Sequence, residues 1–217
     1  MRIERAVGGR RMRWACALLL AAVLAAAPAW AAGDPAGRTE LAPSLTGQLL
    51  IAAPEMADPR FRRTVIYMVS HDASGAFGIV INRLLGKGPI AKLLQGLELE
   101  LDKPPAIDEV PIHYGGPVEI NRFFVLHSRD YVSPHTRAAV GPALLTSDAE
   151  IVRAIATGKG PRFSLFVMGY AGWAPGQLES ELARDDWVVA PAEESFVFES
   201  DMEEMWKRAY QQRQLEL

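Results

Sequence analysis

Runs of hydrophobic residues along the chain predict a series of short buried strands. Residues 64–69 (TVIYMV) are apolar on both faces and rich in β-branched side chains, which is typical of a strand buried between two layers. Residues 77–81 (FGIVI) follow after the turn-forming cluster 72–75 (DASG), so a β-hairpin is the simplest interpretation. Other apolar runs predict strands at residues 112–114, 123–127, 163–168 and 187–190.

Four other segments have the spacing or the end signals of helices. Two of them begin with a predicted capping box, at residues 147–150 (SDAE) and 200–203 (SDME), in which the serine and glutamate side chains each bond to the other's backbone amide. Gly158 is expected to end the first of these helices, and the second carries an apolar stripe that we interpret as core packing. The remaining helices are expected at residues 90–97 and 175–183. Because strands grouped in hairpins are mixed with scattered helices, the pattern predicts an α+β domain.

The first 31 residues have the three-part layout of a secretory signal. Five arginines come first, residues 14–27 form a continuous apolar run, and Pro28 is followed by Ala29-Trp30-Ala31, with small residues at the two positions that a signal peptidase reads. The apolar run is shorter than the about 20 residues of a membrane-spanning helix. We therefore expect cleavage after Ala31, no stable membrane anchor afterwards, and a periplasmic or secreted protein. The alternative is a helix that is retained at the membrane.

The rest of the chain is expected to contain one domain. Residues 32–44 are small, polar and interrupted by proline, so we predict a flexible entry segment. Residues 45–214 are long enough to bury one ordinary apolar core and form the predicted domain.

Removing the leader changes the charge and the chemistry available to the protein. The leader carries five arginines and one glutamate, so the formal net charge changes from −3 to −7 on cleavage. A nucleic-acid partner is disfavoured, because a basic patch supplies most of the affinity for phosphates. Cys16 is the sole cysteine and leaves with the leader. This excludes disulfides, zinc–thiolate sites and thiol nucleophiles from the mature domain.

Histidines at the predicted strand ends are the candidates for catalysis. His71 lies beside Asp72, and His127 ends the strand at 123–127. A His–Asp pair could orient an imidazole as a base. If the protein is a hydrolase, its catalytic candidates are therefore His71, Asp72 and His127. The other interpretation is hydrogen-bonded histidines without a catalytic role. Their spacing matches no metal motif, so we assign no metal and no cofactor; if a metal is present, the imidazoles with Asp72 or Glu179 are the ligands to test.

The densest group of aromatic and polar residues lies at 169–181. A strand is expected to end there in small residues that carry two aromatic side chains, and a helix follows in which Gln177 and Glu181 share one face. These residues could form a binding pocket, or the neighbouring Leu178, Leu182 and Trp187 could close the core. The glycine pair before Pro117 could present backbone amides to an anion, although a tight turn also explains it. The candidate ligand-binding residues are Gly115, Gly116, Tyr170, Trp173, Gln177, Glu179 and Glu181.

Five blocks of the sequence, in this order, resemble the YqgE/AlgH family. They are residues 50–71, 75–82, 114–118, 123–127 and 169–182, followed by Trp187. The resemblance implies an α+β fold, a mixed sheet with a small closed β-barrel flanked by helices. It supplies no agreed catalytic residue, and the family's connection to transcriptional control of alginate synthesis is indirect. The export signal is a departure, because the relatives begin near Leu45. The motif positions present are Asp58, Pro59, Arg62, Arg63, His71, Asn82, Gly115, Gly116, Pro117, His127, Tyr170, Trp173, Gln177, Glu179, Glu181 and Trp187.

Three functional hypotheses follow from the sequence. The leading one is an exported, non-catalytic binding or accessory domain with a groove beside Tyr170 and Trp173, whose ligand or protein partner is not identified. The second is a hydrolase, with or without a metal, that uses His71, Asp72 and His127. The third is an indirect transcriptional regulator, which the acidic charge and the leader both oppose.

The leader generates a direct prediction. In native cells, we expect the protein to lack residues 1–31 and to begin at Ala32, because the sequence Ala29-Trp30-Ala31 is a signal-peptidase site. Mass spectrometry of the protein from fractionated cells measures this end group. An intact amino terminus recovered from the cytosolic fraction would contradict the prediction.

Overall fold

The computed structural model describes residues 43–137, 140–198 and 201–212. All of them lie in one unit of the chain, residues 40–217. The predicted leader, most of the predicted entry segment and Ser200 of the second predicted capping box lie outside the described residues. None of the helices in the described ranges has the length and apolar character needed to cross a membrane.

Strands form most of the described structure. The predicted hairpin is confirmed, because β2 (Val65–Asp72) and β3 (Gly75–Val80) pair antiparallel, with Ile66 opposite Val80 and His71 opposite Ala76. The strands are β1 (Gln48–Ala52), β2 (Val65–Asp72), β3 (Gly75–Val80), β4 (Leu84–Pro89), β5 (Glu109–Tyr114), β6 (Val118–Ser128), β7 (Thr136–Arg137), β8 (Ala143–Thr146), β9 (Ser164–Trp173) and β10 (Trp187–Pro191).

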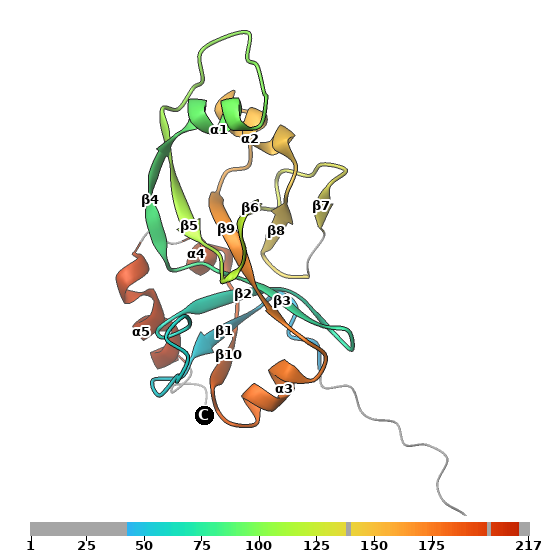
Figure 1. The fold of residues 1–217 in the computed structure, drawn as a ribbon, viewed down its shortest axis with the longest axis vertical. Coiled ribbons are helices and arrows are strands. Elements are labelled where there is room, and N and C mark those ends of the chain that lie inside the picture. Colours follow the sequence, from blue (N-terminus) through green and yellow to red (C-terminus); the bar gives the residue numbers. More distant parts are fainter. Residues whose placement is uncertain (1–42, 138–139, 199–200, 213–217) are drawn as a thin grey trace, which may run out of the picture. The chain divides into compact units, whose positions relative to one another are not determined.

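Strand β9 connects the two parts of the sheet. Its first half pairs in parallel with β5 and antiparallel with β6, and its second half pairs antiparallel with β3. In Figure 1 it runs from the β4, β5 and β6 group down to the β2 and β3 group. The sequence predicts that this strand ends near Met168, but pairing with β3 extends it to Trp173. The full strand order is β10-β1-β2-β3-β9-β6-β8-β7. Off this path, β5 pairs with β9 and β4 pairs with β5.

The mixed α+β fold is confirmed, whereas the predicted closed β-barrel is wrong. The strand order runs from β10 to β7, and no pairing of the described residues joins these two ends. Among the described residues, β7 (Thr136–Arg137) pairs with β8. Strand β9 pairs with β5 and β6 along its first half and with β3 along its second half, so the sheet extends away from β9 in separate directions.

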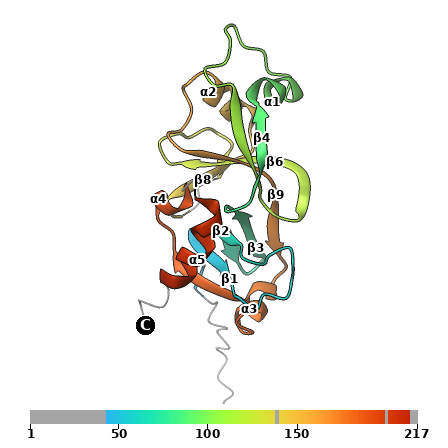
Figure 2. The same cartoon turned by 90° about the vertical axis from the view of Figure 1, so that its left-hand side faces the viewer.

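The helices pack against different parts of this sheet. In both views α1 and α2 lie at one end of the described unit and α3 lies at the opposite end (Figures 1 and 2). Helix α5 contacts β1 and β2, and α3 contacts β3 and β10. The helices are α1 (Ile90–Gly96), α2 (Ala149–Ala156), α3 (Gln177–Leu182), α4 (Glu194–Val197) and α5 (Met202–Gln212).

The capping of α2 differs from its prediction by one residue. Asp148 is the N-cap, and its carboxylate accepts from the amide of Glu150 at 2.9 Å, so the predicted box led by Ser147 is wrong. Aspartate is as good an N-cap as serine, and the local sequence therefore permits either start. Gly158 lies just beyond the last turn with φ +71°, as expected for a helix end.

The apolar stripe of α5 is part of the core, as predicted. Met205 and Ala209 are fully buried with the strand residues of the largest hydrophobic cluster. The Trp206 indole nitrogen donates to the carbonyl of Ala52 at 2.8 Å, which ties the helix to β1. At the centre of the same cluster, the Tyr67 hydroxyl donates to the carbonyl of Ala143 and accepts from its amide.

The glycine pair before Pro117 allows two backbone segments to approach closely. Gly116 has φ +151°, and a Cβ there would lie 2.1 Å from the carbonyl carbon of Tyr170. A Cβ on Gly115 would lie 2.3 Å from the carbonyl oxygen of Gly169. Both neighbours are backbone atoms of β9, so they have no side-chain freedom with which to give way.

The close contact at Gly116 predicts that one added methyl group strongly lowers the stability of the fold. We expect Gly116→Ala to lower the free energy of unfolding by about 2–4 kcal/mol, because β9 must shift to admit the Cβ. At Gly96, at the end of α1, an added Cβ would have open space within 4 Å, so this glycine is the matched control. For Gly96→Ala we expect a change between zero and about 1 kcal/mol of stabilisation. Urea unfolding measures both variants, and equal stabilities would contradict the prediction.

Candidate functional site

A cavity of about 380 Å³ lies where the loop after β1, the end of β9, α3 and the start of β10 meet. Three aromatic rings line it: Phe61 from the loop, Trp173 from the last position of β9 and Trp187 from the first position of β10. The sheet brings them together, since Trp173 is opposite Ala76 and Trp187 is opposite Ala52. The remaining lining residues are Met56, Ala57, Asp58, Arg60, Pro117, Val118, Gly172, Gln177, Glu181, Arg184 and Asp186.

Glu181 is the centre of the polar network in this cavity. The indole nitrogens of Trp173 and Trp187 both donate to its Oε2 atom, each at 2.8 Å. Gln177 donates to its Oε1 atom at 2.9 Å, so the predicted shared helix face of Gln177 and Glu181 is confirmed. The partners of this carboxylate in the described chain are therefore three neutral N–H groups.

The aromatic rings pack against one another around that carboxylate. Phe61 stacks on Trp173 with ring centres 6.4 Å apart, and it meets the edge of Trp187 at 5.5 Å. The two indoles are nearly perpendicular, with centres 5.9 Å apart. Both tryptophans are buried, at 7% and 4% exposure. A buried indole needs an acceptor for its N–H group, and Glu181 meets this need for both.

Two arginine–aspartate pairs also line the cavity. Arg60 donates from Nε and Nη2 to the Asp58 carboxylate, with a closest distance of 2.6 Å. Arg184 donates from the same two groups to Asp186 at 3.1 and 2.8 Å. The hydrogen bond from Arg60 lowers the pKa of Asp58, although burial acts in the opposite direction. Each guanidinium therefore already has a carboxylate partner.

His71 lies outside this cavity and joins three parts of the fold. Its Nδ1 atom accepts from the amide of Leu45 at 3.1 Å, so Nε2 carries the proton of the neutral ring and lies 2.9 Å from Glu179 Oε1. Its backbone carbonyl accepts from Ser44, and its amide donates to Thr46. The pKa of Glu179 is lowered, first by its own backbone amide and then by His71. Both ring nitrogens of His71 are thus engaged in holding residues 44–46 and α3 to β2.

Asp72 is not the partner of His71. The two are consecutive on β2, where successive side chains point to opposite faces; His71 is buried and Asp72 is exposed. The Asp72 carboxylate accepts from the amide and hydroxyl of Ser74 at the hairpin turn. These hydrogen bonds lower its pKa, the hydroxyl of Ser74 being the larger cause.

His127 and His113 are buried in other parts of the sheet. His127 is inaccessible to solvent; its Nδ1 is 2.9 Å from the carbonyl of Ser128 and its Nε2 is 2.9 Å from the hydroxyl of Thr146. Burial lowers the pKa of both histidines. A hydrogen bond to a backbone carbonyl acts in the opposite direction, from Phe166 on His113 and from Ser128 on His127. No hydrogen bond of the described residues joins His127 to His71. Within the same ranges, no group of three or more His, Cys, Asp or Glu side chains could hold a metal ion.

The structure separates the predicted binding residues into two sets. Trp173, Gln177 and Glu181 line the cavity, whereas Glu179 bonds to His71. Tyr170 packs against Phe77 and Phe124 instead.

The glycine pair does not line the cavity, although the next two residues, Pro117 and Val118, do. The Gly115 amide donates to the carbonyl of Met168, and the Gly115 carbonyl accepts from Val80. That amide therefore already has a backbone acceptor in the sheet.

The ligand-binding candidates predicted from the sequence include three of the fourteen lining residues: Trp173, Gln177 and Glu181. Phe61, Arg60 and Arg184 are not among the candidates, and Trp187 is predicted as a core residue and as a motif position of the family resemblance. One local signal was available, because Asp58–Arg60 and Arg184–Asp186 are acid–base pairs two residues apart. The sequence gives no spacing, however, that relates the loop before β2 to the loop before β10.

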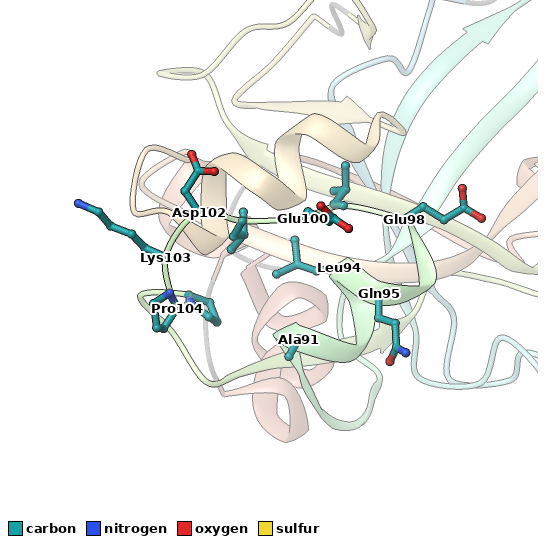
Figure 3. Close-up of a pocket in the computed structure, with 11 residues that line it drawn as sticks. Ala91, Leu94, Gln95, Glu98, Glu100, Asp102, Lys103 and Pro104 are labelled. Carbon is teal, nitrogen blue, oxygen red and sulfur yellow. The ribbon is translucent and has the colours of Figure 1, made fainter.

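A second hollow lies beside α1 and offers less chemistry. It has a volume of about 710 Å³ and is lined by α1 and residues 98–105. Figure 3 shows Leu94 directed into it, while Lys103 and Glu98 point away. The charged groups of this hollow do not converge, so the Glu181 cavity is the better candidate site.

Comparison with known proteins identifies the family. The model of the AlgH-like family (DUF179) matches residues 49–217. The chain belongs to the AlgH-like family. It is 44% identical over 164 residues to a UPF0301 protein of Methylococcus capsulatus, covering 76% of this chain and 88% of the relative. A UPF0301 protein of Afipia carboxidovorans is 44% identical over 179 residues, 80% of this chain and 85% of the relative. The resemblance drawn from the sequence blocks is confirmed.

Two solved structures share the fold of this AlgH-like chain. The solution structure of AlgH from Pseudomonas aeruginosa superposes with a TM-score of 0.65 at 40% identity, over 78% of this chain and 89% of that one. A crystal structure of a Corynebacterium diphtheriae protein has a TM-score of 0.51 at 21% identity, over 69% of this chain and 76% of that one, and supports the fold alone. AlgH-like family membership brings no established biochemical role with it.

The buried histidines predict how stability depends on pH. Folding lowers the pKa of His113 and His127 from the ordinary value of 6.5. Below that pH the unfolded chain therefore binds more protons than the folded one, and the free energy of unfolding falls as the pH is lowered from 7 to about 5. Each histidine contributes a slope of at most about 1.4 kcal/mol per pH unit.

Urea unfolding of the protein and two variants between pH 7 and about 5 measures this slope. We expect His127→Gln to have a shallower slope. His135→Gln, at a histidine whose side chain is 70% exposed and whose Nε2 lies 3.9 Å from Asp148, is the comparison variant, and we expect it to change the slope less than His127→Gln does. An identical slope in all three proteins would show that His127 is not the titrating group.

Proposed function

We propose that this chain is an exported, non-catalytic binding domain whose ligand occupies the Glu181 cavity. One observation carries the proposal: polar and aromatic side chains from four segments converge on a concave site of about 380 Å³. A volume of this size is within the range of small-ligand sites, about 300–1,000 Å³. Its lining combines three aromatic rings with five charged side chains and one amide, so it can contact both apolar and polar groups of a ligand.

The composition of the cavity lining supports binding over catalysis. Its described residues include no Ser, Thr, Cys, His, Lys or Tyr. Asp58 and Asp186 are paired with arginines, and Glu181 accepts three hydrogen bonds. His71 and His127 lie outside this lining, and both ring nitrogens of each have partners.

The export part of the proposal depends on the leader. Residues 1–31 have the layout of a signal peptide, and the charge of −7 after cleavage disfavours a role in direct contact with DNA. We therefore propose that the cavity serves a ligand or partner in the periplasm or outside the cell.

Tryptophan side chains provide the test of binding. The indole N–H groups of Trp173 and Trp187 both contact Glu181, whereas that of Trp206 bonds to Ala52. In ¹H–¹⁵N spectra, we expect a ligand in the cavity to shift the first two indole signals and leave the third unchanged. The titrated panel comprises small amines, carboxylates, sugars and short peptides.

The Trp206 signal is the internal control, since it reports folding without reporting the cavity. Trp→Phe variants assign the three signals. If no compound of the panel moves the Trp173 and Trp187 signals at millimolar concentration, or if all three signals move together, the proposed binding function is wrong.

A further inference from the structure

Taking the proposed binding function as its basis, we propose that the Glu181 cavity binds an organic cation. The ligand group is an ammonium or guanidinium, either of a free amine or of a lysine or arginine side chain on a partner protein. Its positive charge would lie against the Glu181 carboxylate, beside the aromatic rings that line the cavity.

The balance of charge in the cavity lining favours a cation. The lining carries the carboxylates of Asp58, Glu181 and Asp186 and the guanidiniums of Arg60 and Arg184. Two aspartate–arginine ion pairs account for four of these groups. Glu181 forms no ion pair with any described residue, and its three hydrogen-bond donors are neutral. The cavity therefore keeps one uncompensated negative charge on a partly buried carboxylate.

Glu181 also has an unused hydrogen-bond acceptor position. An ionised carboxylate has about four lone-pair positions on its two oxygens. The indoles use two positions on Oε2, and Gln177 uses one on Oε1. An ammonium or guanidinium N–H could bond to the remaining position on Oε1 without displacing any existing donor. Such a charge-assisted bond is stronger than one between neutral groups.

The aromatic rings of the lining, Phe61, Trp173 and Trp187, also favour a cation. The faces of Trp and Phe rings carry negative charge density that attracts cations within about 6 Å of the ring centre. The chain itself places a cation against this wall, because the Arg60 guanidinium carbon lies 5.9 Å from the centre of the Phe61 ring. Trp173 and Trp187 extend the same lining toward Glu181.

An anionic ligand fits the same cavity poorly. Each arginine already directs two N–H groups at its own aspartate, so an anion would have to displace that carboxylate. It would also approach the charge of Glu181, and like charges at close range are unfavourable. A neutral apolar ligand would remove water from Glu181 without compensating its charge, which is costly.

Three probes of similar size test the charge preference: n-butylammonium chloride, sodium butyrate and n-butanol, each titrated at constant ionic strength of about 0.15 M. The Trp173 and Trp187 indole signals report binding, with Trp206 as the internal control. We expect butylammonium to bind at least about tenfold more tightly than either other probe. If butyrate or butanol binds equally well, the cation inference is wrong while the binding function stands. If no member of the wider panel binds, the binding function itself is wrong.

Two glutamates on α3 provide a matched pair of variants. Glu181→Gln removes the charge inside the cavity, and Glu179→Gln removes the same charge two residues away, where the carboxylate bonds to His71. We expect Glu181→Gln to weaken butylammonium binding by about tenfold or more and Glu179→Gln by less than about twofold. Equal effects would mean that only the overall charge matters and would overturn the inference.

An exposed arginine keeps the test informative if Glu181→Gln does not fold. The Arg184 side chain is 60% exposed, and its removal as Arg184→Gln frees the charge of Asp186 at the cavity without touching the indole network. We expect this variant to bind butylammonium more tightly. Arg153→Gln on α2, where the arginine also pairs with an acid, is the control with the same change in net charge. Unchanged or weaker binding by Arg184→Gln would contradict the inference.

The source of the cation is decided by one more comparison. An end-blocked tripeptide with a central lysine is titrated alongside butylammonium. Tighter binding of the peptide, by about tenfold, indicates a side chain of a partner protein. Tighter binding of the free amine indicates a small-molecule ligand. Both results support an organic cation, whereas failure of both probes to bind overturns it.

Discussion

The backbone pairing of β9 is the constraint on which the rest of the structure depends. One half of this strand pairs with β5 and β6, and the other half pairs with β3. The close approach of its backbone to Gly115 and Gly116 leaves no room for a side chain at either glycine. Because the ladder continues as far as Trp173, the last side chain of β9 lies at the wall of the cavity, and α3 begins only a few residues later.

The network around Glu181 turns this backbone frame into a defined polar site. Two buried indole N–H groups would lose stability without an acceptor, and one carboxylate oxygen serves both. The same arrangement leaves a negative charge that no described cation neutralises. The need of two buried indoles for an acceptor and the proposed preference for a cationic ligand therefore have one physical origin, since the tryptophans fix the carboxylate in place with donors that carry no charge.

The histidines show why residue type alone is weak evidence for catalysis. His71 and His127 occupy strand ends, where active sites are often built, but both ring nitrogens of each have a partner. In His71 these partners hold the segment at Leu45 and the helix at Glu179 against β2. The ring acts as a connector between distant parts of the fold. An imidazole used in this way has no lone pair available for a substrate proton.

The sequence by itself determined the features that depend on near neighbours. Residues close together in the sequence predict three of these features: the β2–β3 hairpin, the apolar stripe of α5 and the shared face of Gln177 and Glu181. The order of five sequence blocks predicts membership of the AlgH-like family. Local signals also misled in places. The glycines at 169 and 172 suggested the end of a strand, although pairing with β3 carries β9 through them.

Only the tertiary structure decided the open sheet, the partner of His71 and the cavity. Glu179 lies 108 residues from His71 in the sequence, and the loop at Phe61 meets Trp187 because β1 pairs with β10. Periodicity describes which side chains share a face of one element. It does not describe which face of another element will cover it, because that choice depends on the burial and hydrogen bonding of the whole domain.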